Sequence, residues 1–391
     1  MKIVILGNYP LYKYASDLGV LFDSKKRVFS CNEELTKALC NIKSNSIHFI
    51  TRTDILDKTT SIKKDNLTIT FLATPRLLNG MTLFQNIRWT VQKILDKIRP
   101  DIVHGIGLEH IWPYIAVKSG FPHVVTIHGI PSEIVRKVRT PLLSRMRYFN
   151  MLERFVLKKA RHIISISPYV DHVLRKKTTA QFFPVENAHS LIYHNLHAKP
   201  GESKVILFVG DTSERKALNE LLVAFSKICD LDFARDWQIH VVGPLHKDSY
   251  FNNHIQKTIS NFDLQDRVVF KGFLFPDKLA KEYESAAFLV LCSLEETAPG
   301  CIAEAMAAGL PVVAYGISGV PYMIDNGKSG FLCEARNVDM LSGKLKIMMM
   351  DPALRNSMGK RGKDIAAKRW RPDIVADKTN DVYKVISQRS Q

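Results

Sequence analysis

The feature that most constrains the fold is an alternation of short apolar runs with stretches of helical periodicity, which occurs in two series along the 391 residues. Short runs rich in Val, Ile and Phe indicate buried strands, and apolar residues at spacings of three and four indicate helices. This alternation is typical of an α/β protein with a mostly parallel sheet covered by helices. The two series are separated by a turn-rich segment, residues 194–203, so we expect two Rossmann-like domains.

The elements expected in each series can be given by residue number. In the first series we expect helices over residues 33–42, 84–98 and 141–159, and strands over residues 3–6, 46–50, 67–71, 102–104, 124–128 and 163–167. In the second series we expect strands over residues 205–209, 238–242, 268–270, 288–291, 312–315 and 330–333, and helices over residues 217–229, 251–262, 277–286, 299–308 and 338–350. A last helix over residues 373–387 is expected to pack back toward the first domain.

Charge is divided unevenly between the two halves. Of the net charge of +17, residues 1–200 carry about +16 and residues 201–391 about +1, so a partner with a negative surface should meet the first half. We expect no membrane-spanning helix, because no stretch of about 18 uncharged apolar residues occurs. The N-terminal apolar run is expected to be a strand, not a signal peptide. The six cysteines lack paired spacing, which favours reduced thiols and a cytoplasmic protein.

The most informative stretch runs from Leu291 to Ala314. A buried strand ends near its start, and an Ala-rich helix follows, with Thr297 as the expected N-cap, Pro299 in the first turn and Gly309 after the last turn. The helix would therefore begin at the carboxyl edge of the sheet, where α/β folds bind ligands. Its free N–H groups and its dipole favour an anion such as a diphosphate.

Two carboxylates flank this helix start, Glu296 and Glu304, with seven residues between them. Their separation of about 10 Å along a helix axis is comparable with the distance between the hexose and ribose hydroxyls of a nucleotide sugar. An ionised carboxylate can accept hydrogen bonds from two vicinal hydroxyls. On spacing alone, one ordinary carboxylate at a helix start and one solvated carboxylate explain the pattern equally well.

Flanking residues distinguish these alternatives, because Glu304-Ala-Met-Ala-Ala-Gly-Leu-Pro-Val-Val-Ala314 closely resembles the E-x7-E signature of the retaining glycosyltransferases of family GT4. The resemblance implies a GT-B fold, with two Rossmann-like domains facing each other across a cleft. It implies that Glu296 holds the hydroxyls of the transferred sugar and Glu304 the ribose diol. The turn Thr297–Cys301, which includes Pro299 and Gly300, would bind the donor diphosphate and offer backbone N–H groups to sugar and phosphate.

A second match is the segment Phe208–Lys216, which resembles the strand, glycine and basic loop of the same family. Gly210 would let a diphosphate approach the backbone, and Lys216 stands where the family has its phosphate-binding lysine. The family usually has Arg directly after the glycine, whereas this chain has Asp211, and Arg215 is a candidate replacement. The alternative for both cations is a solvated helix turn. Residues 268–273 resemble the element beside the nucleotide base, which implies that Gly272 and Phe273 border the base.

The resemblance is weaker in the first half. Val125-Thr-Ile-His-Gly129 resembles a family strand that ends in a histidine, and the resemblance implies that His128 lies near the donor sugar. A histidine at a strand end is otherwise more often structural, which is the interpretation we favour for His104. The family's glycine pair near the first helix is replaced by Val28-Phe29-Ser30.

A basic amphipathic segment, residues 136–159, offers two interpretations. Its apolar residues at helical spacing can pack against the core while its basic face is solvated. Alternatively, the segment can lie on an anionic leaflet, where each basic residue contributes about 1 kcal/mol. The basic excess of the whole first half is the stronger argument for an anionic membrane surface as a partner.

Together these observations predict an acceptor domain over residues 1–195, a nucleotide-sugar donor domain over residues 200–370, and a C-terminal crossover helix over residues 371–391. The resemblance implies metal-independent hexosyl transfer from a UDP- or GDP-sugar with retention of configuration, and no cofactor. The charge pattern favours a lipid-linked saccharide or glycolipid acceptor in polysaccharide or lipopolysaccharide synthesis, at the cytoplasmic face of a membrane. The alternative is a non-catalytic relative that binds glycan or nucleotide sugar within a synthesis complex. An epimerase, a phosphorylase and a nucleic-acid-binding protein are less consistent with the motifs.

Overall fold

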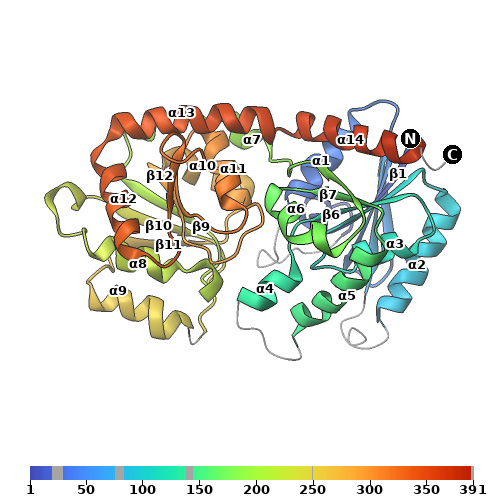
Figure 1. The fold of residues 1–391 in the computed structure, drawn as a ribbon, viewed down its shortest axis with the longest axis horizontal. Helices are drawn as coiled ribbons and strands as arrows, with labels where there is room; N and C mark the ends of the chain where they lie inside the picture. The colour runs from blue at the N-terminus through green and yellow to red at the C-terminus, as the bar shows by residue number, and fades with distance from the viewer. Residues whose placement is uncertain (20–29, 75–82, 138–143, 249, 389–391) are drawn as a thin grey trace. The chain divides into compact units, whose positions relative to one another are not determined.

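The chain folds into two compact units in the computed structural model, which describes residues 1–19, 30–74, 83–137, 144–248 and 250–388 (Figure 1). The first unit consists of Met1–Ala188 and Pro372–Gln391, and the second consists of His189–Arg371. The glycine replacement at Val28 and Phe29 and the beginning of the helix expected from residue 141 lie outside the described residues. Among the described helices, none is long and apolar enough to cross a membrane.

The first unit contains a sheet of eight strands in the order β3-β4-β2-β1-β5-β6-β7-β8. All neighbours are parallel except β3 and β4. The strands are β1 Lys2–Leu6, β2 Ser46–Thr53, β3 Thr60–Lys64, β4 Leu67–Ala73, β5 Ile102–Ile106, β6 His123–Ile127, β7 His162–Ser165 and β8 Gln181–Pro184. The helices are α1 Ser30–Cys40, α2 Leu83–Ile98, α3 Trp112–Lys118, α4 Pro131–Lys137, α5 Arg145–Lys159, α6 Pro168–Leu174 and α14 Pro372–Gln388.

Successive side chains of the buried strands enter two different cores. Ile3 and Ile5 of β1 pack with residues of α1 and α14, whereas Val4 and Leu6 pack with residues of α2 and α3. The C-terminal helix α14 is thus part of the first unit. Two hydrogen bonds fix it there, from Asn45 Nδ2 to Asn380 Oδ1 (2.9 Å) and between His104 and Tyr383 (2.7 Å).

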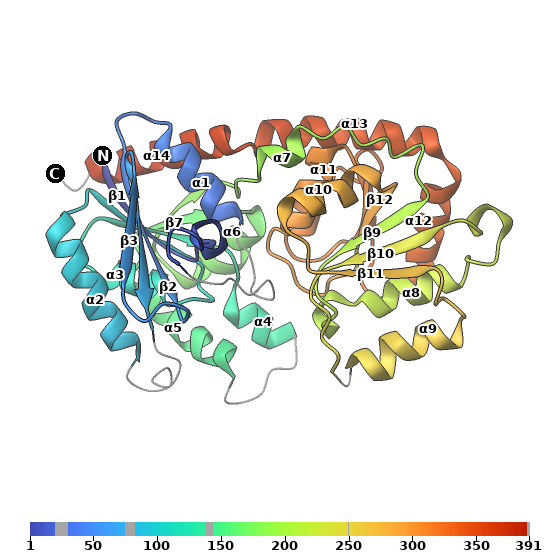
Figure 2. The same cartoon turned by 180° about the vertical axis from the view of Figure 1, so that it is seen from behind.

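The second unit contains a parallel sheet of six strands in the order β11-β10-β9-β12-β13-β14. Strands β9, β10, β11 and β12 are labelled in Figure 2. The strands are β9 Val205–Val209, β10 Gln238–Val242, β11 Val268–Gly272, β12 Phe288–Leu291, β13 Val312–Tyr315 and β14 Gly330–Cys333. The helices are α7 Leu191–His194, α8 Leu218–Ser226, α9 Lys257–Asn261, α10 Pro276–Ser285, α11 Gly300–Ala308, α12 Val338–Met350 and α13 Pro352–Arg369. Helices α8, α9 and α12 contribute to one core, and α7, α10 and α11 to the other.

The second unit begins at residue 189 of the chain. The sequence pattern predicts an acceptor domain that extends to residue 195. Residues 189–195 are grouped with the second unit because α7 packs on its core: the ring of Tyr193 lies 5.5 Å from that of Tyr283, and both are buried. The segment 200–201 is fixed by the buried Arg355 of α13, which donates to the carbonyl oxygens of Pro200 (2.7 Å) and Gly201 (3.0 Å).

Candidate functional site

The E-x7-E stretch forms a strand, a loop and a helix at the carboxyl edge of the second sheet. Strand β12 ends at Leu291 and α11 begins at Gly300. The expectation that Thr297 is the N-cap is wrong, because the N-cap is Pro299, whose ψ of 121° is extended. Proline has no side-chain oxygen for capping, so the first N–H groups of α11, at Gly300 and Cys301, keep the capacity to bind an anion.

Glu296 lies at the centre of an ionic cluster in this loop. Its Oε1 is 2.5 Å from Lys216 Nζ and 3.1 Å from Arg215 Nη1. The guanidinium of Arg215 also donates to the carbonyl oxygen of Glu295 at 2.9 Å, and the Arg215 carbonyl accepts from the Leu294 N–H at 2.8 Å. The structure therefore brings together three predicted site residues, and Arg215 reaches the same carboxylate oxygen as Lys216.

The electrostatics of this cluster favour the charged form of the carboxylate. Burial alone would raise the pKa of the Glu296 carboxyl, but Lys216 and Arg215 lower it below its ordinary value. Glu296 is thus an ionised acceptor at neutral pH. When an anion binds beside Lys216 and Arg215, one of these cations can turn to the anion. The Glu296 carboxylate can then accept a hydrogen bond from a hydroxyl in its place.

Glu304 lies on the second turn of α11 and is buried. Its Oε2 accepts a hydrogen bond from the hydroxyl of Tyr283 on α10 (2.9 Å), and its Oε1 lies 3.8 Å from Nδ1 of the buried His189. The imidazole of His189 is also close to the helix start, because a Cβ at Gly300 would lie 3.2 Å from its Cε1. Tyr283 and His189 orient Glu304, and sequence analysis missed both.

Glycines make the basic loop after β9 compact. A Cβ at Gly243, whose φ is +146°, would lie 2.1 Å from the carbonyl oxygen of Gly210, so only glycine fits there. At Gly210 itself a Cβ would contact the aliphatic stem of Lys216 at 3.2 Å. Asp211, which replaces the family's arginine, accepts from the backbone N–H of Ser213 at 3.1 Å and so shapes the turn that carries Arg215 and Lys216.

The elements predicted to border the base lie next to this loop. Gly272 has a φ of +67°, and its carbonyl accepts from the Gly243 N–H at 2.9 Å, which joins the ends of β10 and β11. Phe273 packs edge-on against Phe275 at 5.3 Å. Gly319 contacts the far side of the site, because its N–H donates to the Glu296 carbonyl at 2.9 Å. The base-binding roles of Gly272 and Phe273 stay predictions.

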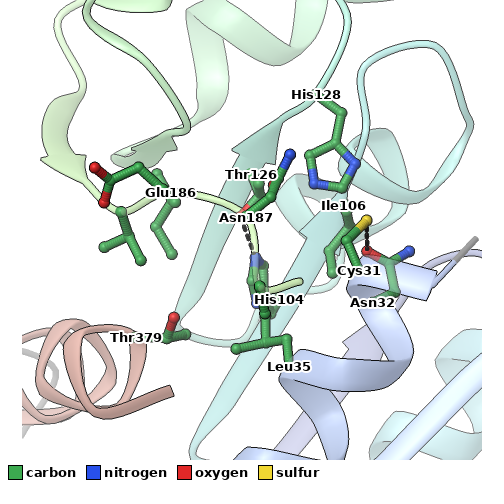
Figure 3. A pocket seen from close by; sticks show the side chains of 13 residues that line it. Cys31, Asn32, Leu35, His104, Ile106, Thr126, His128, Glu186, Asn187 and Thr379 are labelled. Carbon is green, nitrogen blue, oxygen red and sulfur yellow. Dashed lines mark hydrogen bonds between the residues drawn. The ribbon is translucent and has the colours of Figure 1, made fainter. Parts of the chain in front are cut away.

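His128 lies in the first unit, directly after β6, and lines a small cavity with Cys31, Asn32 and Asn187 (Figure 3). The cavity volume of about 20 Å³ is enough for a single water molecule. His104, in the same cavity, is fully buried between the hydroxyls of Tyr383 (2.7 Å) and Thr126 (2.6 Å). Burial and the neighbouring His128 lower the pKa of His104 to about 3, consistent with the structural role expected for it. The sugar-binding role of His128 stays a prediction.

Two protein-family descriptions match the chain in succession. Residues 192–365 match "Glycosyl transferases group 1", and residues 37–181 match "Glycosyltransferase Family 4". Together the two matches span most of both units. The chain belongs to the GT4-like glycosyltransferases.

Similar proteins agree with this family. The chain is 22% identical over 306 residues to an alpha-D-kanosaminyltransferase of Streptomyces kanamyceticus, an overlap of 72% of this chain and 75% of the relative. Sucrose-phosphate synthase from Thermosynechococcus elongatus has a similar structure, with a TM-score of 0.82, 17% identity and full coverage of both chains. Anabaena HepE in complex with UDP-glucose has a TM-score of 0.71 and 14% identity, with coverage of 98% of this chain and 100% of HepE. This GT4-like chain therefore has the GT-B fold.

Proposed function

We propose that this glycosyltransferase moves a hexosyl unit from a UDP- or GDP-sugar to a saccharide or lipid-linked acceptor. The observation that carries the proposal is the cluster of Glu296, Lys216 and Arg215 beside the first N–H groups of α11. Two cations and a helix N-terminus suit a diphosphate, and Glu296 and Glu304 suit the hydroxyls on its two sides. The UDP-glucose bound to HepE supports a nucleotide-sugar donor.

In the proposed reaction, the bond between the anomeric carbon and the diphosphate oxygen breaks as the acceptor hydroxyl attacks the same carbon. Lys216 and Arg215 stabilise the negative charge that develops on the leaving diphosphate. The leaving phosphate oxygen takes the acceptor proton, and attack on the same face of the sugar retains the anomeric configuration. Glu296 holds sugar hydroxyls, and His128 contacts the donor sugar.

Two carboxylates of the first unit, Glu109 and Glu153, are held by the backbone, which supports attack without an enzyme nucleophile. The carboxylate of Glu109 accepts from the Gly129 N–H at 3.0 Å, and Glu153 accepts from the N–H and hydroxyl of Ser132 at 2.9 and 2.6 Å. Both carboxylates thus stabilise backbone turns. NMR analysis of the product anomer tests retention: an inverted product would contradict the proposed face of attack.

Lys216 and Arg215 supply the positive charge that a divalent cation supplies in other transferases, so we expect metal-independent transfer and no cofactor. Turnover should be the same in the presence and in the absence of EDTA. A loss of turnover with EDTA that Mg²⁺ or Mn²⁺ restores would contradict this part of the proposal.

The first unit offers a surface for an anionic membrane at α5. Phe149, Val156 and Leu157 are buried, as the core-packed interpretation of the segment requires, and the other face exposes Met151, Arg154, Lys158 and Lys159. Trp89 on α2 and Met151 are each 60% exposed. An exposed basic face with a few large apolar side chains favours peripheral binding to the cytoplasmic leaflet, near a lipid-linked acceptor of polysaccharide or lipopolysaccharide synthesis.

A second candidate function is a non-catalytic, ligand-binding relative, which the replacement of the family's arginine by Asp211 favours. Asp211 places a carboxylate next to the expected diphosphate. Burial would raise the pKa of this carboxyl, but hydrogen bonds from Ser213 and the nearby cations Arg215 and Lys216 lower it below its ordinary value. Such a protein would bind the nucleotide sugar and release no nucleotide.

The experiment that tests the proposal is a thermal-shift panel of UDP, GDP, ADP and their common sugars, without metal, on the wild type and on Glu304→Ala. A ligand at a hundred times its dissociation constant stabilises the folded state by about 2.7 kcal/mol. One nucleotide family should stabilise the wild type and not the variant. The absence of any shift with the wild type would contradict donor binding, and binding without turnover would favour the non-catalytic function.

A further inference from the structure

A buried histidine, His189, lies beside the start of α11 in the second unit. It comes two residues before α7, and α7, α10 and α11 lie side by side (Figure 1 and Figure 2). The backbone N–H of His189 donates to the Trp370 carbonyl at 2.9 Å, and the ring of Tyr193 in α7 packs against that of Tyr283 in α10. These contacts fix the backbone that carries the imidazole, and His189 is only 5% exposed.

The imidazole faces a carboxylate oxygen without forming a hydrogen bond to it. Nδ1 of His189 lies 3.8 Å from Oε1 of Glu304, which is beyond hydrogen-bonding distance. Among the described residues this nitrogen has no hydrogen-bonding partner. The other carboxylate oxygen, Oε2, already accepts from the Tyr283 hydroxyl at 2.9 Å. Because a buried polar atom without a partner is costly, Nδ1 indicates a ligand group that hydrogen-bonds to it.

Gly300, the first residue of α11, leaves both polar atoms accessible from one side. A Cβ at this position would lie 3.9 Å from Nδ1 of His189 and 3.8 Å from Oε1 of Glu304, so both atoms are close to the helix start. The same Cβ would make a tight contact of 3.2 Å with Cε1 of the imidazole. A larger side chain here would therefore cover the pair. Gly300 itself is half-buried, so a ligand group can approach the two atoms beside it.

The chemistry of the two atoms favours a hydroxyl over a phosphate. An ionised carboxylate only accepts hydrogen bonds, so the imidazole proton is favoured on Nδ1, the nitrogen that faces Glu304. Two atoms at this separation can each lie about 2.8 Å from a single oxygen. That oxygen has to accept from Nδ1 of His189 and donate to Oε1 of Glu304. A hydroxyl does both, whereas an ionised phosphate oxygen only accepts and is repelled by the carboxylate.

Another histidine and carboxylate in the second unit form a pair of the opposite kind. Nδ1 of His240 on β10 lies 2.8 Å from Oε2 of Glu282 on α10, and Nζ of Lys271 lies 3.4 Å from Oε1 of the same carboxylate. This pair is joined by a direct hydrogen bond, so it needs no further group. The longer separation of His189 and Glu304 is thus not a general feature of such pairs in this unit.

We infer that His189 is a specificity-determining residue for ribose, whose Nδ1–H donates to the same ribose hydroxyl that donates to Oε1 of Glu304. The inference rests on the proposed nucleotide-sugar donor and goes beyond it, because it adds a second contact to the diol and predicts discrimination against deoxyribose. A site that hydrogen-bonds a hydroxyl rejects an analogue that lacks it, since its buried polar groups are then left unpaired. Lys216 and Arg215 remain available for the diphosphate.

The experiment measures, by calorimetry, the preference of each variant for a ribonucleoside diphosphate over its 2′-deoxy and 3′-deoxy forms. UDP, GDP and ADP are compared on the wild type, and the tightest binder is then used with its two deoxy forms. His189→Phe keeps a buried ring and removes the donor, so the preference for one of the two hydroxyls should fall about tenfold. His189→Asn, whose amide N–H can replace Nδ1–H, should retain part of that preference.

Two control variants separate a contact to ribose from a structural role. His240→Phe removes the histidine of the directly bonded pair and should keep the preference of the wild type. Tyr283→Phe acts on the diol only through Glu304, so it should lower the preference for both hydroxyls. A loss for both hydroxyls in His189→Phe, equal to that in Tyr283→Phe, would show that His189 only orients Glu304 and would overturn the inference.

Further outcomes distinguish failure of the inference from failure of the proposed function. Because each preference compares ligands on one variant, a general loss of stability in His189→Phe does not alter it. Tight nucleotide binding with the same preference in His189→Phe as in the wild type would overturn the inference and leave the proposed function intact. Inorganic pyrophosphate should bind His189→Phe like the wild type, and a tenfold weaker binding would overturn the assignment to a hydroxyl. Binding of no nucleoside diphosphate to the wild type would overturn the proposed function and the inference together.

Discussion

The two units differ in the charge of the polar groups that they hold at the centre of their hydrogen-bond networks. In the second unit Glu296 neutralises Lys216 and Arg215, so the ionic cluster is balanced within the protein. In the first unit the fully buried His104 is held between the hydroxyls of Tyr383 and Thr126, and burial lowers its pKa to about 3, so it is neutral. The ionic cluster has to exchange a partner when an anion binds, whereas the neutral network of His104 has no charge to offer an anion. We therefore expect substitutions in the second unit to change turnover most, and substitutions in the first unit to change binding or stability.

The largest expected effect is that of Glu296→Gln. The amide keeps the shape but loses the charge that holds sugar hydroxyls, so turnover should fall about 10²- to 10³-fold, the usual cost of one transition-state partner. Nucleotide-sugar binding, measured by calorimetry, should change little. Lys216→Met is the comparison variant and should weaken both binding and turnover. Equal donor affinity and equal turnover in the two variants would contradict the assignment.

The next largest effect is expected from acidification, which should destabilise the first unit at a higher pH than the second. Burial lowers the pKa of His48 to about 4 and that of His104 to about 3, and it also lowers the pKa of His123, all in the first unit. Between pH 6.5 and about 4 the unfolded chain then binds more protons, so stability falls as pH falls, by up to ~1.4 kcal/mol per pH unit for each histidine. The lowered pKa of Glu296 stabilises the second unit above the ordinary carboxyl pKa, and this contribution is lost only at lower pH.

Hydrogen exchange read by mass spectrometry checks this order. Segments of β5 and β6 should lose protection at a higher pH than segments of α11. Loss of protection in both units at the same pH, above the carboxyl range, would contradict the predicted order.

Two tyrosines allow a matched comparison of smaller size. Tyr283→Phe removes the donor to the buried Glu304, and Tyr383→Phe removes one of the two hydroxyls that hydrogen-bond to the buried His104. Each variant should lose ~1–2 kcal/mol of unfolding free energy, because one buried polar group loses a hydrogen bond. Nucleotide binding should weaken for Tyr283→Phe alone. Weaker nucleotide binding in both variants would contradict the assignment of the nucleotide site to the second unit alone.

The smallest expected effect concerns the exposed face of α5. Arg154→Gln should weaken binding to anionic vesicles by about 1 kcal/mol, the contribution of one basic residue near the surface. Lys360→Gln, on the exposed face of α13 in the second unit, is the control and should bind vesicles like the wild type. Co-sedimentation at low salt measures both, and equal losses would argue against α5 as the membrane face.

The units also differ in how much of each could be predicted from sequence. Strands β9, β10, β12, β13 and β14 have the predicted bounds, because strands covered on both faces are continuous apolar runs between turns. In the first unit the edge strands β3 and β8 were missed. In β3 the pattern Thr-Ser-Ile-Lys-Lys has a single apolar residue, and the strand pairs antiparallel to β4. An edge strand such as β3 forms because it pairs with β4, and its own five residues carry no clear strand pattern.

Helix α13 was missed for a different reason. It contains Gly359 and Gly362, which lower helix propensity, and few apolar residues mark its buried face. The structure explains Gly359, since a Cβ there would lie 2.0 Å from the carbonyl oxygen of Gly309 at the end of α11. The site shows the same limit: motif residues such as Glu296 and Lys216 were predicted, whereas Tyr283 and His189 meet Glu304 only through tertiary packing.

The position of α14 has a consequence for synthesis of the chain on the ribosome. Val375, Tyr383 and Ile386 belong to the same core as Ile3, Ile5 and Phe49 of the first strands. A nascent chain adds about 5–20 residues each second, so the first strands leave the ribosome well before their last packing partners. The unit that is translated first is thus completed last, and the second unit can finish folding while the first still exposes part of its apolar face.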